Sequence, residues 1–150
     1  MKLLIAVDGS ELSLEGVRFA VRVLLAGLRG EVVLANVQEP ANLYELLVAH
    51  DPEVIDRVSA EAGLHALKDA QALLDAAQVP YEVEVAKGDP AHTLIDICER
   101  FACDMIVMGA RGTSALRSTL LGSVSNEVLH ASAVPVMIVK PDAPIDDDQA

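Results

Sequence analysis

The stretch MIVMGARGTSALRSTLLGS, residues 105–123, changes character abruptly after its fourth residue. The first four residues are apolar, which is typical of a buried strand. The remainder contains Gly109, Gly112 and Gly122, two arginines and several hydroxyl side chains. Glycine permits backbone angles closed to other residues and lets the main chain approach a ligand without an intervening Cβ. We therefore expect a strand followed by a loop that holds a ligand through its backbone.

Short apolar runs and helical periodicities alternate along the whole chain. The apolar runs predict strands over residues 3–7, 32–37, 81–86, 104–108 and 134–139. Apolar residues at intervals of three and four predict helices over residues 14–25, 52–79, 90–101 and 121–131, whereas residues 41–50 fit an irregular connection or a short extra helix. Five strands alternating with four main helices predict an α/β fold with a five-stranded parallel open sheet and helices on both faces.

Local signals refine this order. Asp51-Pro52 and Asp89-Pro90 each predict a helix start, with Asp as the cap and Pro in the first turn. Residues 81–86 alternate apolar and acidic side chains, which favours an edge strand with one wetter face. The last strand, residues 134–139, is expected at the other edge, where it invites pairing with a second copy. The opposing hypothesis is a monomer in which Lys140-Pro141 and the tail shield that edge.

Size and composition exclude several classes of protein. A chain of 150 residues fits one domain, which we expect to cover residues 1–140. The last ten residues, PDAPIDDDQA, combine prolines with four aspartates and predict an acidic, disordered tail over residues 141–150. Apolar residues make up 52% of the sequence and aromatic residues 3%, so the core must be built from Ala, Val, Leu and Ile. The formal charge of −12 argues against nucleic acid as a partner.

Targeting signals and cysteines complete these limits. The apolar runs are far shorter than the roughly 18 residues of a membrane span, and residues 3–7 are too short for the centre of a secretory signal. We expect a cytoplasmic protein. Cys98 and Cys103 fit neither a metal motif nor a disulfide framework, and are predicted to be buried thiols.

A ligand of such a sheet is expected beyond the carboxyl ends of the strands, where the winding direction reverses. Successive N–H groups around Gly109 and Gly112 can converge on an anion there. Gly122-Ser123, placed where the next helix opens, can add free amides and a hydroxyl at the positive end of the helix dipole. A phosphate is the expected anion. Arg111 and Arg117 either add charge to this site or are solvated.

Three motifs together resemble the universal stress protein family. They are Gly109-x-x-Gly112, nine residues and Gly122-Ser123, the stretch IAVDGS at residues 5–10, and VPVMIV at residues 134–139. The resemblance covers residues 2–140 and is to the ATP-binding branch of the family, since the other branch lacks the glycine pattern. It implies a Rossmann-like fold of the adenine nucleotide alpha hydrolase-like type. It also implies a homodimer that pairs antiparallel through the last strand.

The resemblance implies a set of binding residues. Asp8, with the backbone of Ala6 and Val7, would contact the adenosine, and the Val37 main chain would meet adenine. The phosphates of ATP, with any Mg²⁺ carried by the nucleotide, would lie against Met108, Gly109, Arg111, Gly112, Gly122, Ser123, Val124 and Ser125. Some ATP-binding members carry Pro in place of Ala6, but the contact implied there is through the backbone. Asp8 has an independent rationale, because a carboxylate at a strand end can accept hydrogen bonds from ribose hydroxyls. Its other interpretation is a cap for the first helix.

The sequence favours binding over catalysis. It lacks the Walker lysine and hydroxyl that clamp outer phosphates and Mg²⁺. It shows no Ser/His/Asp order, and its four histidines are scattered. We expect an ATP-binding stress-response protein with little or no hydrolysis. The alternatives are a nucleotide-free dimeric scaffold and a slow ATPase, and the sequence leaves open ATP against ADP, AMP or a cyclic nucleotide.

Overall fold

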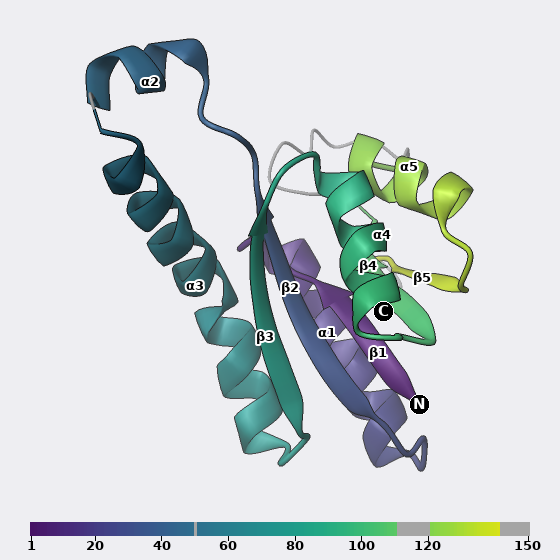
Figure 1. Ribbon diagram of the computed structural model, residues 1–150. Helices are drawn as coiled ribbons and strands as arrows, with labels where there is room; N and C mark the ends of the chain where they lie inside the picture. Colours follow the sequence, from purple (N-terminus) through teal and green to yellow (C-terminus); the bar gives the residue numbers. More distant parts are fainter. Residues whose placement is uncertain (50, 111–120, 142–150) are drawn as a thin grey trace, which may run out of the picture.

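The computed structural model describes residues 1–49, 51–110 and 121–141 (Figure 1). Strands and helices alternate through these residues, as the sequence predicts. The strands are β1 (Lys2–Ala6), β2 (Glu31–Gln38), β3 (Tyr81–Lys87), β4 (Met105–Gly109) and β5 (Val136–Val139). The helices are α1 (Glu11–Leu25), α2 (Leu43–Ala49), α3 (Pro52–Ala76), α4 (Pro90–Arg100) and α5 (Ser123–Ala131).

The five strands form one parallel sheet in the order β3-β2-β1-β4-β5. This confirms the predicted fold class, and it confirms both predicted edges, β3 and β5. From β1 the chain winds outward through β2 to β3, and then returns to the other side of β1 to form β4 and β5. The winding direction therefore reverses between β1 and β4, where ligands of open α/β sheets bind.

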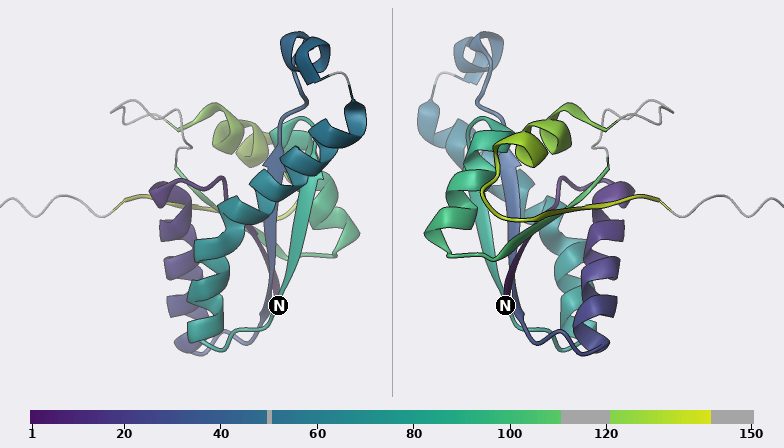
Figure 2. Two further views of the ribbon diagram at one scale, coloured as in Figure 1. Left: turned by 90° about the vertical axis from the view of Figure 1, so that its left-hand side faces the viewer. Right: turned by 90° about the vertical axis from the view of Figure 1, so that its right-hand side faces the viewer.

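Helices cover both faces of the sheet. Figure 2 shows α1 and α3 on one side and α4 on the other, where α5 also packs. Alternate strand residues face opposite layers: Leu3 and Ile5 pack with α1 and α3, whereas Leu4 packs with α4 and α5. Each fully buried side chain of this kind contributes about 1.5–3 kcal/mol. The apolar core consists of aliphatic residues, Met108 and two cysteines, with no aromatic residue among the fully buried ones of the described chain.

Side-chain caps explain where the helices begin. Asp51 accepts a hydrogen bond from Glu53 N–H (2.9 Å) and Asp89 accepts one from His92 N–H (3.1 Å), which confirms both predicted Asp-Pro starts. The cap of α1 is Ser10, whose Oγ accepts from Ser13 N–H. The interpretation of Asp8 as that cap was wrong.

The reason is local. Gly9 adopts a φ of +87°, and the turn it makes brings the backbone N–H of Ser10 to Oδ1 of Asp8 at 2.9 Å. Asp8 thus orients the capping residue, and Ser10 caps the helix.

Other boundaries shift by a few residues. Helix α3 ends at Ala76, before Gln78, which adopts a left-handed φ of 55°. Strand β5 begins at Val136, directly after Pro135, which has no N–H to donate to the ladder. Residues 41–50 contain the short extra helix α2. In the tail, residues 142–150 lie outside the described residues.

The structure also bears on the cysteines and on membrane spans. Cys98 and Cys103 are both buried free thiols, as predicted. Within the described ranges, no helix is both long enough and apolar enough to cross a membrane.

Candidate functional site

The turn after β1 is fixed from both sides by its neighbours. The N–H of Val7 donates to the carbonyl of Ala35 in β2 (2.9 Å). On the other side, the N–H of Asp8 donates to Ser13 Oγ in α1 (3.4 Å). Asp8 itself is exposed, and its Oδ1 accepts hydrogen bonds from both the N–H and the hydroxyl of Ser10. A rigid turn therefore presents this carboxylate at the carboxyl end of the sheet.

Asn36 is a residue of this site that the sequence analysis missed. It is buried, and its Nδ2 donates to the carbonyl oxygen of Val7 at 2.8 Å. Its Oδ1 accepts in turn from Gln38 Nε2 at 2.7 Å. The signal in the sequence is a single polar residue inside the apolar run of residues 32–37, because a buried amide needs partners.

Val37 directs its backbone toward the space left by the end of β1. In a parallel sheet, the backbone groups of successive residues point to opposite neighbouring strands. The carbonyl of Ala35 accepts from Val7 on the β1 side, and the carbonyl of Gln38 accepts from Gly88 on the β3 side (3.0 Å). The N–H and C=O of Val37 therefore face the β1 side, although the β1 register ends at the pair Ala6 and Ala35. This geometry suits recognition of a planar ring edge by the main chain.

Gly109, the last residue of β4, lies against the start of α1. A Cβ at this position would be 2.8 Å from the carbonyl oxygen of Leu12 and 3.5 Å from Ser13 N. Only a residue without a side chain permits this approach, which brings the end of β4 next to the turn that holds Asp8. Met108 precedes it as a buried core residue.

The two described ends of the glycine-rich loop are hydrogen-bonded to each other. The N–H of Gly122 donates to the carbonyl of Ala110 (2.9 Å), and Ala110 N–H donates to Val139 in β5 (3.0 Å). The buried hydroxyl of Ser125 donates to the carbonyl of Gly109 (2.9 Å). These bonds hold the start of α5 at the end of β4. Arg111 and Gly112, two predicted ligands, lie outside the described residues, as does Arg117.

The start of α5 offers three backbone donors. Gly122 is the N-cap and has no side chain, so it provides no capping bond. The first intrahelical bond runs from Asn126 N–H to the Gly122 carbonyl (3.0 Å). The amides of Ser123, Val124 and Ser125 therefore have no partner within the helix. They lie at its positive end, which favours an anion.

The predicted residues consequently form two groups. Ala6, Val7, Asp8 and Val37 surround the ends of β1 and β2, and Met108, Gly109 and residues 122–125 surround the end of β4 and the start of α5. The contact of Gly109 with α1 joins the two groups. Two groups of these residues already have hydrogen-bond partners within the protein: the amide of Gly122 and the hydroxyl of Ser125. No cluster of three or more metal-binding side chains occurs among the residues for which positions are given.

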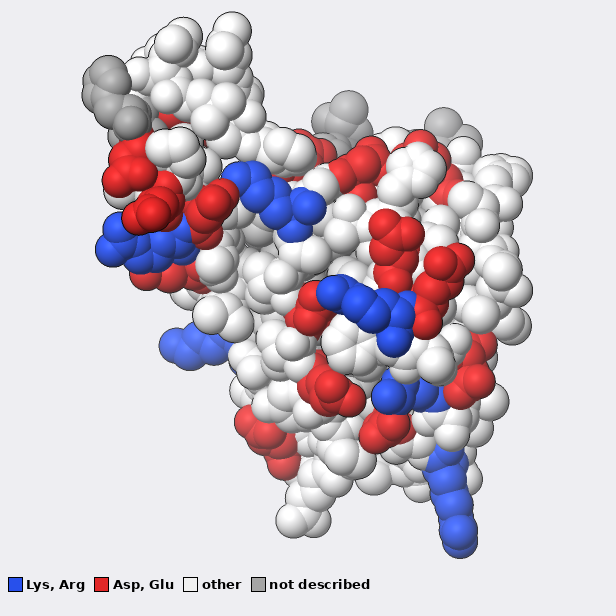
Figure 3. Space-filling view, in the orientation of Figure 1, with Lys and Arg blue, Asp and Glu red and all other residues white. Residues whose placement is uncertain are grey.

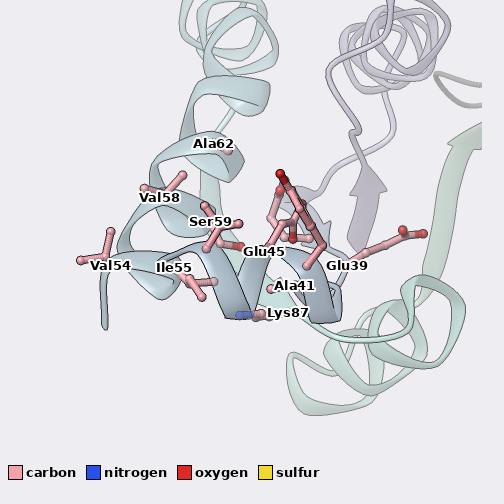
Figure 4. A pocket seen from close by; sticks show the side chains of 12 residues that line it. Glu39, Ala41, Glu45, Val54, Ile55, Val58, Ser59, Ala62 and Lys87 are labelled. Carbon is pink, nitrogen blue, oxygen red and sulfur yellow. The ribbon is translucent and has the colours of Figure 1, made fainter. Parts of the chain in front are cut away.

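A cavity of about 470 Å³ lies away from this reversal point, between α2, α3 and the ends of β2 and β3 (Figure 4). Its wall is largely apolar. Gln38 lines it, so the cavity adjoins the hydrogen-bonded pair of Gln38 and Asn36.

Comparison with known sequences gives a consistent result. Residues 1–140 match the model of the universal stress protein family. The universal stress protein MJ0531 of Methanocaldococcus jannaschii is 31% identical over 139 residues, which cover 93% of this chain and 81% of the relative. The universal stress protein YxiE of Bacillus subtilis is 32% identical over 146 residues, which cover 93% of this chain and 98% of the relative.

Solved structures share the fold. The hypothetical protein MJ0577 superposes with a TM-score of 0.78 at 25% identity, over 95% of this chain and 96% of that one. A universal stress protein in complex with cAMP gives a TM-score of 0.69 at 24% identity, over 93% and 96% of the two chains. A family member from Arabidopsis thaliana with AMP bound gives 0.65 at 19% identity, over 95% and 93%. By its sequence match and its architecture, the chain belongs to the universal stress protein family.

Proposed function

We propose that this protein binds an adenine nucleotide, with ATP as the expected ligand, and acts as a stress-response sensor or regulator with little or no hydrolysis. The observation that carries this proposal is the uncapped start of α5. Its first three amides stand at the point where the sheet reverses its winding, held there by the bond from Gly122 to Ala110. The cAMP and AMP complexes of two proteins with the same fold support an adenine nucleotide as the ligand.

The two residue groups correspond to the two ends of such a ligand. Adenosine would meet the exposed carboxylate of Asp8 and the backbone of Ala6, Val7 and Val37. The phosphates would meet the amides of residues 123–125 and the backbone around Gly109, with Arg111 and Gly112 from the loop. Any Mg²⁺ would arrive with the nucleotide.

Binding can be separated from the general stability of the helix by one pair of variants. Ser123→Pro deletes the first amide of α5, at the helical position where Pro is best tolerated. Ser123→Ala keeps the amide and removes only the hydroxyl. A hydrogen bond to a charged group contributes about 1.5–3 kcal/mol, so Ser123→Pro should weaken ATP binding about 10- to 100-fold, measured by titration calorimetry. Ser123→Ala should have the smaller effect. Equal ATP affinity in all three proteins would contradict the proposed site.

Two alternative functions remain testable. Saturating ATP, at about 100 times its dissociation constant, should stabilise the protein by about 2.7 kcal/mol against heat. No shift at millimolar ATP would favour a nucleotide-free scaffold. Phosphate release over many turnovers, abolished by Gly122→Val, would favour a slow ATPase.

We further propose a homodimer through β5. The carbonyl of Pro135 accepts from Ile106 in β4, and that of Val139 accepts from Ala110 directly after β4. The N–H groups of Val136 and Ile138 therefore point outward from the sheet edge. Val136→Pro removes one outward donor, and Val136→Ala controls for the lost side chain. Sedimentation should show dissociation with Pro only. We assign the nucleotide-binding unit to residues 1–140, whereas the tail over residues 141–150 and a cytoplasmic location stay predictions from the sequence.

A further inference from the structure

Helix α2 exposes an unusual number of apolar side chains. Its sequence is LYELLVA, and Leu43, Tyr44, Leu47 and Val48 are all largely exposed. The helix projects beyond the sheet and packs on the first turns of α3 (Figures 1 and 2). Contiguous exposed apolar surface of this kind marks interaction sites.

The start of α2 is stabilised by its own side chains. Asn42 Oδ1 accepts from Glu45 N–H (2.9 Å), and Glu45 Oε2 accepts from Asn42 N–H (3.1 Å). This reciprocal capping box satisfies two amides at the start of α2. The apolar surface is therefore presented on a capped helix.

The cavity opens beneath this surface. Tyr44 and Val48 of α2 line it, as do Val54 and Val58 of α3. Lys87, at the end of β3, also belongs to the lining (Figure 4). Its volume of about 470 Å³ lies within the range of natural binding pockets. A bulky apolar side chain inserted there would act as the anchor that most interfaces depend on.

Charge around the surface indicates the kind of partner. Residues 39–62 contain six acidic residues and one basic residue, Arg57. Lys87 is already paired with Asp56 at 3.0 Å. In Figure 3 the projecting end that α2 forms shows almost no charged side chains, and acidic and basic side chains lie directly below it. A second copy that docked here through the same surface would bring a second acidic segment against this one, which opposes pairing at this surface, whereas a cationic partner is attracted.

We propose that α2 and the first turns of α3 form a docking surface for a cationic amphipathic helix of a partner protein. The apolar face of that helix lies on Leu43, Tyr44 and Leu47, one large side chain enters the cavity, and its lysines or arginines face the acidic rim. Docking of an amphipathic helix into an apolar groove is a common mode of recognition. The surface lies apart from the uncapped start of α5, although its cavity is lined by Gln38, which directly follows Val37 of the proposed adenosine end.

The test uses a synthetic 18-residue amphipathic helix of Leu and Lys with one Trp on its apolar face. This protein has no Trp, so the peptide's fluorescence reports its burial without background. We expect saturable binding with a blue shift, weakened by salt. The same peptide with Glu in place of Lys should bind at least tenfold more weakly.

Two leucine variants supply the matched control. Leu47 is 65% exposed on α2, and Leu25 is 67% exposed at the end of α1. Leu47→Ser should raise the dissociation constant at least tenfold, and Leu25→Ser should leave it unchanged. Equal binding of the Lys and Glu peptides, or equal effects of the two variants, would overturn the proposal. Self-association that Leu47→Ser abolishes and Leu25→Ser preserves, seen by sedimentation, would also overturn it by identifying a second copy as the occupant.

Discussion

The side chain of Asn36 holds the backbone of Val7, 29 positions earlier in the chain, through a hydrogen bond of 2.8 Å. The bond forms where β1 ends, so it takes the place of a further rung of the ladder between β1 and β2. Because Asp8 follows Val7 directly, Asn36 also sets the position of the carboxylate proposed to meet the nucleotide.

Asn36→Leu should therefore destabilise the protein. The substitution keeps a similar volume but leaves the buried Val7 carbonyl without the amide, and an unsatisfied buried polar group costs about 1–3 kcal/mol. Urea unfolding should show this loss as a lower midpoint at an unchanged slope. Gln38→Leu is the comparison: it removes the donor to Asn36 Oδ1 but keeps the bond from Asn36 to Val7, so it should cost less than Asn36→Leu. Equal losses in both variants would mean that the bond to Val7 is not the important one.

Two helical glycines should respond in opposite directions to alanine. A Cβ on Gly63 in α3 would lie 2.4 Å from Val85 Cγ1 and 3.0 Å from Asn36 Oδ1. A Cβ on Gly16 in α1 would meet nothing closer than 3.8 Å. Ala is better than Gly in a helix by about 0.8–1.0 kcal/mol, whereas overpacking costs about 1–3 kcal/mol.

Gly16→Ala should accordingly raise the free energy of unfolding, and Gly63→Ala should lower it. Both can be measured by urea denaturation under one set of conditions. A stabilising Gly63→Ala would show that α3 can move away from β2 and β3 without cost, and that the close approach at Asn36 does not constrain the fold.

These examples separate what the sequence could predict from what it could not. The Asp-Pro starts of α3 and α4 were predicted because a cap is a local interaction between residues two or three positions apart. The parallel sheet followed from the alternation of strands and helices, and the β3 edge from the acidic side chains along residues 81–86, whereas the strand order itself comes from the structure. The cap of α1 was misassigned because Asp8 and Ser10 are both good capping residues, and only the left-handed turn at Gly9 decides between them.

The long-range contacts in the site could not be predicted from the sequence. Nothing in the neighbourhood of Asn36 identifies Val7 as its partner, and nothing near Gly109 reveals that the backbone of Leu12 lies against it. The glycine at 109 was interpreted as ligand access alone, although packing of α1 also demands it. The sequence did not decide between a helix and an irregular connection for residues 41–50. Helix α2 packs mainly on α3, so its apolar residues do not follow the pattern of a helix with one buried face.

The buried thiols predict a loss of stability at alkaline pH. Burial, as the main cause, raises the pKa of Cys103 to about 11 from an ordinary value of 9.0, and burial also raises the pKa of Cys98. The folded state then keeps the thiol proton while the unfolded state ionises. The stabilising contribution is complete below about pH 9 and is lost as pH rises toward 11.

Urea unfolding between pH 8 and 10.5 should show this decline, and Cys103→Ala should reduce its slope. The native thiols should also react slowly with a disulfide reagent at pH 8 and quickly after unfolding. Fast reaction of the folded protein would show that Cys98 and Cys103 are accessible as thiolates.

The two ends of the proposed nucleotide site can be distinguished with adenosine, which lacks phosphates. Asp8→Ala removes the carboxylate at the adenosine end, and Ser123→Pro removes a main-chain donor at the phosphate end. If the first contacts ribose, it should weaken adenosine and ATP by similar factors. If the second contacts phosphate, it should weaken ATP about 10- to 100-fold and leave adenosine unchanged, because only ATP carries the anion that the start of α5 attracts.

Asp8→Ala also removes the bonds to Ser10, so its effect on folding must be measured separately, by thermal unfolding without ligand. Ser10→Ala is the control: it removes the α1 cap, at a cost of about 0.5–2 kcal/mol, and keeps the carboxylate. Weak nucleotide binding by Asp8→Ala with normal binding by Ser10→Ala would place the carboxylate against the ligand. Equal weakening by both variants would instead assign the effect to the turn, since a distorted start of α1 would disturb the main chain of residues 6–8 in either case.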